Sequence, residues 1–173
     1  MGRVLAMNVM LLLGLGLVSN AAAQETEQIG DFFYVTSADP FDDDDRSMVA
    51  TIEIGADEYM DDNAFLAWRC LPDGLNVIYG FNSYMGGDEE ERVLVRYRFD
   101  RREATDFERW SMMQGNDAAW IPMHWVSQFT EQAKAGSKVV FRVTDPLDGE
   151  TLTHEFNLAG LGQALTRLSC ATY

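Results

Sequence analysis

The stretch FLAWRCLPDGLNVIYGF (Phe65–Phe81) holds two apolar runs separated by a Pro-Asp-Gly turn signal. Proline fixes one backbone angle of a tight turn, aspartate hydrogen-bonds the backbone, and glycine accepts positive φ. After the turn, the apolar residues alternate and place Leu75, Val77, Tyr79 and Phe81 on one face. This alternation is typical of a half-buried antiparallel strand, so the stretch predicts a β-hairpin.

The same period of two recurs on both sides of this hairpin, in MVATIEI (48–54), RVLVRYRF (92–99) and KVVFRVT (138–144). The apolar faces predicted for these strands are Met48, Ala50, Ile52 and Ile54; Val93, Val95, Tyr97 and Phe99; and Val139, Phe141 and Val143. The segment DPLDGETLTHEF (145–156) predicts a second hairpin, which joins the last two strands.

Two segments carry helical rather than strand periodicity. The first runs from Met123 to Ala135, and Gly136 follows it as a stop signal. The second is expected to begin after Asn157, a good N-cap residue, and its apolar stripe is Leu158, Leu161, Leu165 and Leu168. The chain is therefore predicted to be mainly β, an antiparallel β-sandwich-like domain with one or two covering α-helices.

The first residues have the features of a cleaved signal peptide. Arg3 supplies the positive charge, and the apolar run Val9–Val18 is shorter than the roughly 20 residues that span a bilayer. Ala21-Ala22-Ala23 gives the small-residue cleavage pattern. We therefore expect a leader at 1–23, a single β-rich domain at 24–173, and export to a bacterial periplasm without a transmembrane anchor.

The composition restricts the partners of the expected mature chain. Only Arg3 is charged in the leader, so 12 of the 13 basic residues remain against 28 acidic ones, a net charge of −16. Such a chain is repelled by nucleic acid and by anionic membrane surfaces, so nucleic-acid binding is not expected.

The chain has two cysteines, Cys70 and Cys170. In an oxidising compartment two cysteines favour one disulfide, and the alternative is a pair of free buried thiols. Two cysteines so far apart in sequence, without a CxxC pair, do not predict a metal site.

Basic residues are concentrated between positions 92 and 109. One interpretation is cross-strand ion pairing with the neighbouring acidic runs, Asp57–Asp62 and Asp88–Glu91. The other is a patch that docks an anion or a partner, with Arg92, Arg96 and Arg98 as candidate residues. Arginine's planar fork suits carboxylates, including those of peptidoglycan stem peptides.

The run DPFDDDD contains five aspartates, which are candidate metal ligands: Asp39, Asp42, Asp43, Asp44 and Asp45. An EF-hand loop needs glycine at its sixth position, where a start at Asp39 gives Asp44 and a start at Asp42 gives Ser47. The run therefore fails the EF-hand spacing. We expect a solvated acidic turn before a strand, with Asx-turns and partial neutralisation by Arg46, and a calcium site of another type as the alternative.

Signatures of catalysis are absent from the sequence. It has two histidines, of which His154 shares the face of Leu152 and Phe156 and is expected to be a hydrogen-bonded core or rim residue. Neither a GxSxG nucleophile turn nor an HExxH zinc motif is present. Glycoside hydrolysis needs only two carboxylates, and with 28 acidic residues in the chain their presence does not indicate a glycosidase.

A series of motifs carries a resemblance to a known family: DPFDDDDRSMVATIE, LAWRC, LNVIYGFNSYMGG, VLVRYRFD, RWSM, AAWIP and VVFRVTDPLDGETLTHEFNLAGLGQALTRLSC. Their order resembles that of the periplasmic VasI/TagO-like family, which in some bacteria is associated with type VI secretion gene clusters. The likeness covers Phe33 to Cys170, although the acidic run is denser than the family pattern and LAWRC replaces a more aliphatic strand. The resemblance implies pairing of Cys70 with Cys170 and carries no catalytic residues.

These observations together predict an exported, non-catalytic accessory or interaction protein of the bacterial envelope, of the type associated with type VI secretion. Its partner would be an envelope protein or a peptidoglycan-related molecule, and no cofactor is expected. The alternatives are a periplasmic domain that binds a small ligand or calcium and, third, an enzyme that acts on cell-wall material. The oligomeric state is left open.

Overall fold

The computed structural model describes residues 26–42, 44–56 and 63–171 of the chain. The predicted leader at 1–23 lies outside these residues, as do Asp43 and the acidic run 57–62 that was expected to pair with the arginines. The elements are β1 (Thr26–Ile29), β2 (Phe32–Val35), β3 (Met48–Ile52), β4 (Phe65–Leu71), β5 (Gly74–Gly80), β6 (Arg92–Phe99), β7 (Glu108–Ser111), β8 (Ala118–Trp120), α1 (Met123–Ala135), β9 (Lys138–Thr144), β10 (Thr151–Asn157) and α2 (Leu161–Leu165).

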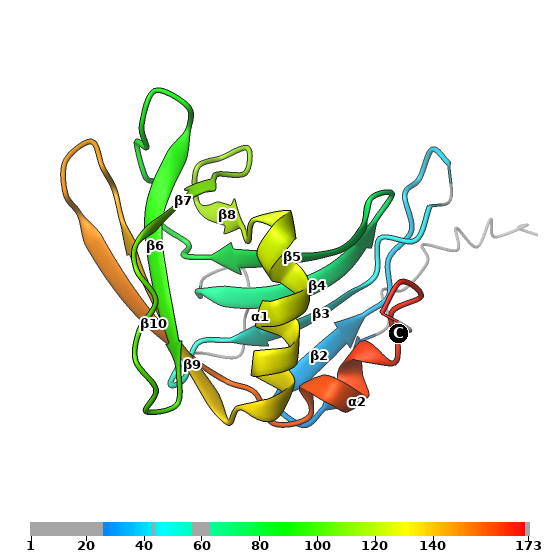
Figure 1. Cartoon of the computed structure of the whole chain (residues 1–173). Coiled ribbons are helices and arrows are strands. Elements are labelled where there is room, and N and C mark those ends of the chain that lie inside the picture. The colour runs from blue at the N-terminus through cyan, green and yellow to red at the C-terminus, as the bar shows by residue number, and fades with distance from the viewer. Residues whose placement is uncertain (1–25, 43, 57–62, 172–173) are drawn as a thin grey trace, which may run out of the picture.

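The strands form two antiparallel sheets, so the predicted β-sandwich-like architecture is confirmed. The first sheet has the order β1-β2-β3-β4-β5-β8 and the second has the order β10-β9-β6-β7. Both predicted hairpins are present. Leu71 pairs with Gly74 across the Pro72-Asp73 turn, and β9 pairs with β10 around the turn that contains Gly149. Figure 1 shows the strands of the second sheet crossing those of the first.

Two backbone links connect the two sheets directly. Met112 and Ala119 form a β-bridge that connects β7 with β8. The backbone N–H of Ile54, just after β3, donates to the carbonyl of Glu155 in β10, an edge strand of the second sheet (2.8 Å). These links hold the inner faces of the sheets together over a shared core.

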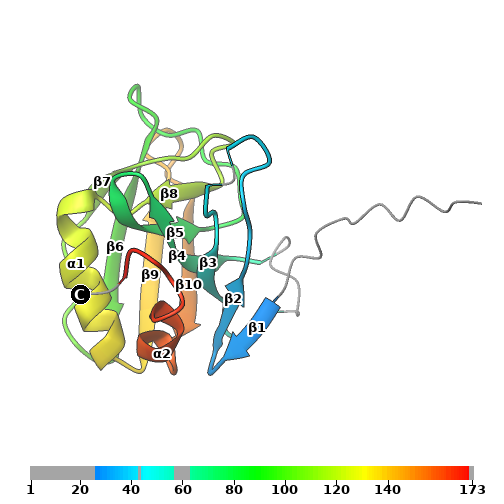
Figure 2. The ribbon, with the colours of Figure 1, turned by 90° about the vertical axis from the view of Figure 1, so that its right-hand side faces the viewer.

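Helix α1 spans Met123–Ala135 and is followed by Gly136, as the sequence predicts. The helix lies over the first sheet and beside β6 of the second (Figures 1 and 2). Its Phe129 ring is 6.0 Å from that of Trp68 in the first sheet and 5.8 Å from that of Phe141 in the second. The indole N–H of Trp68 donates to the hydroxyl of Thr130 (3.0 Å), both of which are buried. Helix α1 therefore completes the core that both sheets line.

The second predicted helix is shorter than expected and begins later. Asn157 lies in β10 rather than capping a helix, and α2 covers only Leu161–Leu165. The late start has a tertiary cause: Gly160, at φ +94°, packs so closely on β1 that a Cβ there would lie 2.7 Å from the carbonyl oxygen of Ile29. The leucine stripe is nevertheless buried, because Leu158, Leu161, Leu165 and Leu168 all join the core.

The predicted core face of β3 is also wrong. Val49, not Ala50, points into the shared core, and Ile54 is 44% exposed. Ala50 instead belongs to an apolar row on the opposite face of the sheet, formed by Phe33, Ala50, Ala67, Ile78 and Trp120. Both faces of this central strand are apolar, so alternation alone does not decide which face meets the second sheet.

Cys70 and Cys170 form a disulfide, which confirms the expected pairing and excludes the free thiols. It ties the segment after α2 to the end of β4. The closed loop spans 100 residues, for which the chain-entropy model gives a stabilisation of roughly 4–5 kcal/mol. No helix in the described part of the chain is long and apolar enough to cross a membrane.

Replacing Thr130 with valine keeps the side-chain shape but removes the acceptor of the Trp68 indole N–H. The buried N–H would then lack a partner, so Thr130→Val is expected to lower the free energy of unfolding by about 1–3 kcal/mol. Thr130→Ser, which retains the hydroxyl, is the control and should lose less. Urea denaturation measures both, and a valine variant as stable as the wild type would contradict the assignment of this hydrogen bond.

Candidate functional site

Strand β6 turns its arginines away from the core. Val93, Val95, Tyr97 and Phe99 are buried, as predicted, so the intervening residues project from the outer face of the second sheet. By register, the basic side chains on that outer face are Arg92, Arg96, Arg98, Arg109, Lys138 and Arg142. We refer to this surface as the arginine face.

Arg92 belongs to an ion-paired group at one end of this surface. Its guanidinium contacts Asp88 at 3.1 Å and Glu90 at 2.8 Å. Asp88 also accepts from Arg109 Nε at 3.2 Å. The interpretation as ion pairing therefore fits Arg92, and this residue does not join the other two candidates in a common pocket.

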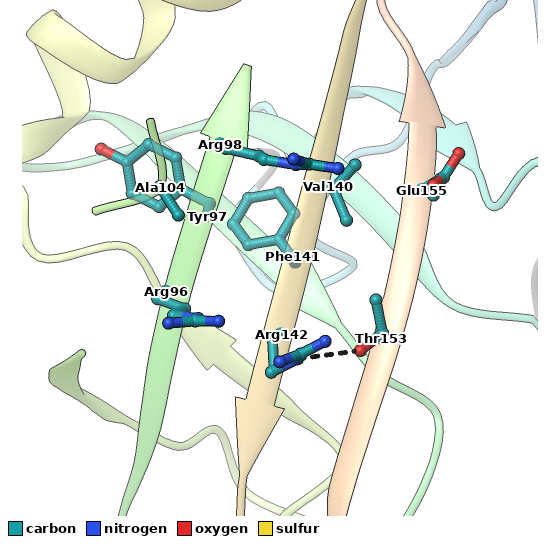
Figure 3. A pocket seen from close by; sticks show the side chains of 9 residues that line it. All are labelled: Arg96, Tyr97, Arg98, Ala104, Val140, Phe141, Arg142, Thr153 and Glu155. Carbon is teal, nitrogen blue, oxygen red and sulfur yellow. Dashed lines mark hydrogen bonds between the residues drawn. The ribbon is translucent and has the colours of Figure 1, made fainter. Parts of the chain in front are cut away.

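Arg96 and Arg98 line a pocket of about 320 Å³ together with Arg142. Arg142 lies directly opposite Arg96 across the β6–β9 ladder. Figure 3 shows the side chains of Arg96 and Arg142 next to each other, with that of Arg98 reaching toward Val140. The three guanidiniums therefore share one opening on the arginine face.

These three arginines lack a carboxylate partner among the described residues. Glu155 also lines the pocket, but its carboxylate is held by Lys138 at 2.7 Å. Like charges placed directly opposite each other on neighbouring strands destabilise a sheet. The protein thus carries a repulsive arrangement that its own acidic residues, although numerous, do not neutralise in the described part of the chain.

Two of the guanidiniums are held in position by neighbours. Arg142 Nε donates to Thr153 Oγ1 at 3.3 Å. The guanidinium of Arg96 lies 4.9 Å from the centroid of the Phe107 ring, within the range of a cation–π contact. Both contacts restrict the side chains without removing their charge, which favours binding of an anion.

The sequence did not indicate Arg142, Thr153 or Phe107 as site residues. The β9–β10 hairpin signal places Thr153 opposite Arg142, and this pairing is local. The pairing of β6 with β9 joins strands that are separated by about 40 residues and by helix α1, so no turn signal specifies its register. The pairing of Arg96 with Arg142 could therefore not be predicted from the sequence and is seen only in the structure.

The described members of the candidate metal-binding run, Asp39, Asp42, Asp44 and Asp45, lie between β2 and β3. Asp39, Asp42 and Asp45 each accept a hydrogen bond from the backbone N–H two residues later, which is the expected Asx-turn pattern. Arg46 pairs with Asp39 at 3.1 Å. Hydrogen bonds from the side chain and backbone of Ser47 lower the pKa of Asp45. Among the described residues, which exclude Asp43, no three His, Cys, Asp or Glu side chains are grouped as metal ligands.

His154 faces the core, opposite Phe141, as its strand pattern predicts. Its Nδ1 lies 2.6 Å from the hydroxyl oxygen of Tyr79. Burial, with a contribution from Glu53, raises the pKa of Tyr79, so its hydroxyl stays protonated and donates. Burial lowers the pKa of His154, which favours the neutral ring that accepts this bond.

Comparison of the chain with protein-family models, curated proteins and solved structures finds no match. The resemblance to the VasI/TagO-like family therefore remains an expectation from the sequence.

The His154 environment makes stability depend on pH. Its pKa in the folded chain is below the ordinary 6.5, so the unfolded chain binds more protons between these two values. Stability should therefore fall as the pH decreases below about 6.5, and His154→Asn, which keeps an acceptor for Tyr79, should lack this contribution. Urea denaturation from pH 8 to 5 measures the difference between the two proteins. His124→Asn is the control, and identical pH profiles for wild type and His154→Asn would refute the assignment.

Proposed function

We propose that the chain is an exported, non-catalytic interaction protein of the bacterial envelope that docks an anionic partner on its arginine face. The observation that carries this proposal is the cluster of Arg96, Arg98 and Arg142, which share a pocket without a described carboxylate partner. Retaining such a repulsive cluster on a folded sheet is physically reasonable when an external anion completes it.

The overall charge of the protein supports a short-range mode of recognition. With a net charge of −15 for the full sequence and −16 without the predicted leader, the molecule repels polyanions at a distance. Within the pocket, three guanidiniums dominate the field, and screening by salt limits the influence of distant acids to about 8–10 Å. The site therefore fits a partner that presents a local group of carboxylates, and it does not fit a long, uniformly charged nucleic acid.

The location and the biological context rest on the sequence. The leader pattern at 1–23 supports export to the periplasm. The resemblance to the VasI/TagO-like family supports an accessory role of the kind associated with type VI secretion, with an envelope protein or a peptidoglycan-related molecule as partner. The disulfide is compatible with an oxidising compartment.

Charge reversal on the arginine face tests the docking function. The mature protein is immobilised and exposed to envelope extract, alongside the double variant Arg96→Glu/Arg98→Glu. A partner that binds through the arginine face should be retained by the wild type and lost by this variant. Its retention should also decrease as salt increases, because the contacts are between charged groups.

The control variant is Arg101→Glu/Arg102→Glu, which changes the net charge equally at two exposed arginines just beyond β6. It should retain the partner. Equal retention by wild type and Arg96→Glu/Arg98→Glu, with both proteins folded, would refute docking through this face.

A further inference from the structure

The positively charged side chains that line the pocket favour a ligand with more than one negative charge. Arg96, Arg98 and Arg142 contribute three positive charges. Glu155 contributes the only carboxylate among the described lining residues, and Lys138 already pairs with it. A single carboxylate would leave most of the positive charge of the pocket without a partner.

The spacing of the arginines distributes this charge over a flat surface. Arg96 and Arg142 are directly opposite, a relationship that places Cβ atoms about 4.5–5.5 Å apart. Arg98 is the next residue on the same face of β6, about 7 Å along the strand from Arg96. This arrangement suits two separate anionic groups better than one compact group, because each group can face its own guanidinium fork.

The pocket also has an apolar component. Val140 and Ala104 line it, and the Phe107 ring packs on Arg96 beside it. Such surfaces contact carbon atoms, so the two anionic groups should be joined by a short aliphatic segment.

The Glu155 carboxylate at the pocket favours a peptide ligand. The carboxylate of Glu155 accepts from Lys138 through Oε2, and a carboxylate accepts several hydrogen bonds. It therefore retains capacity for an N–H donor. A volume of about 320 Å³ is at the small end of the range for ligand pockets, so it accommodates a residue or two rather than a folded surface.

We infer that the pocket is a subsite for a peptide chain that ends in glutamate or aspartate. The terminal residue supplies two carboxylates, separated by only two or three carbon atoms, together with one amide N–H. Arg96 and Arg142 bind one carboxylate, Arg98 binds the other, and Glu155 accepts the N–H. This inference rests on the proposed function, since it specifies the group that the docked partner presents.

Isothermal titration calorimetry of the mature, oxidised protein tests the subsite with matched probes. N-acetyl-Ala-Glu has both carboxylates, its C-terminal amide has only the side-chain carboxylate, and N-acetyl-Ala-Gln has only the terminal one. The peptide with both carboxylates should bind about tenfold or more tightly than either of the others, since each lost group removes a charge-assisted contact. Inorganic phosphate should bind more weakly than N-acetyl-Ala-Glu.

The variant Arg142→Gln should weaken binding of N-acetyl-Ala-Glu by about tenfold or more, while Arg167→Gln, an exposed arginine paired with Glu27, should not. Equal binding of all three peptides, phosphate binding as tight as that of N-acetyl-Ala-Glu, or an unchanged affinity in folded Arg142→Gln would each overturn the subsite. If no probe binds while envelope capture still depends on Arg96 and Arg98, the docking function stands and the peptide subsite is wrong.

Discussion

The packing of Tyr97 against Phe141 and Phe129 is the contact on which both the fold and the candidate site depend. Tyr97 and Phe141 are directly opposite each other on β6 and β9, with ring centroids 5.6 Å apart, and Phe129 brings helix α1 onto both rings. Because side chains alternate along a strand, a slip of one residue would move these rings out of the core. The same register places Arg96 opposite Arg142 on the other face. The core therefore determines the geometry of the arginine pair.

Because the same strands carry the core on one face and the arginines on the other, the site is rigid without a loop or helix of its own. The guanidiniums stand on β6 and β9, whose inward side chains are buried, and Thr153 and Phe107 restrain two of them from the side. Sites built on strands are more precise than sites built on loops. The unfavourable term is the repulsion between Arg96 and Arg142, which the large aromatic core and the disulfide offset. The like charges of this arginine pair thus lower the stability of an otherwise well-packed domain.

Local sequence signals predicted much of this fold. Turn residues located both hairpins, and periodicity with Gly136 delimited α1. The cysteine count, together with the predicted export signal, indicated the disulfide. The errors arose where distant segments decide the outcome. The close approach of Gly160 to β1 moved the start of α2 to Leu161, and the apolar outer row around Ala50 obscured the core face of β3. The candidate site was half predicted. Arg96 and Arg98 lie in it as expected, but Arg142 joins them through the long-range pairing of β6 with β9. The third candidate, Arg92, is instead paired with Asp88.

The central claim is that the cluster of Arg96, Arg98 and Arg142 binds an anionic ligand and that, without this ligand, the cluster lowers the stability of the protein. The stability of ligand-free Arg142→Gln tests this claim most directly, because glutamine removes the charge and can still bond Thr153. Relief of the repulsion should raise the free energy of unfolding by about 0.2–1 kcal/mol, with a larger gain at low salt. A guanidinium with a structural role would give the opposite result, a variant less stable than the wild type at every salt concentration, and this would contradict the account.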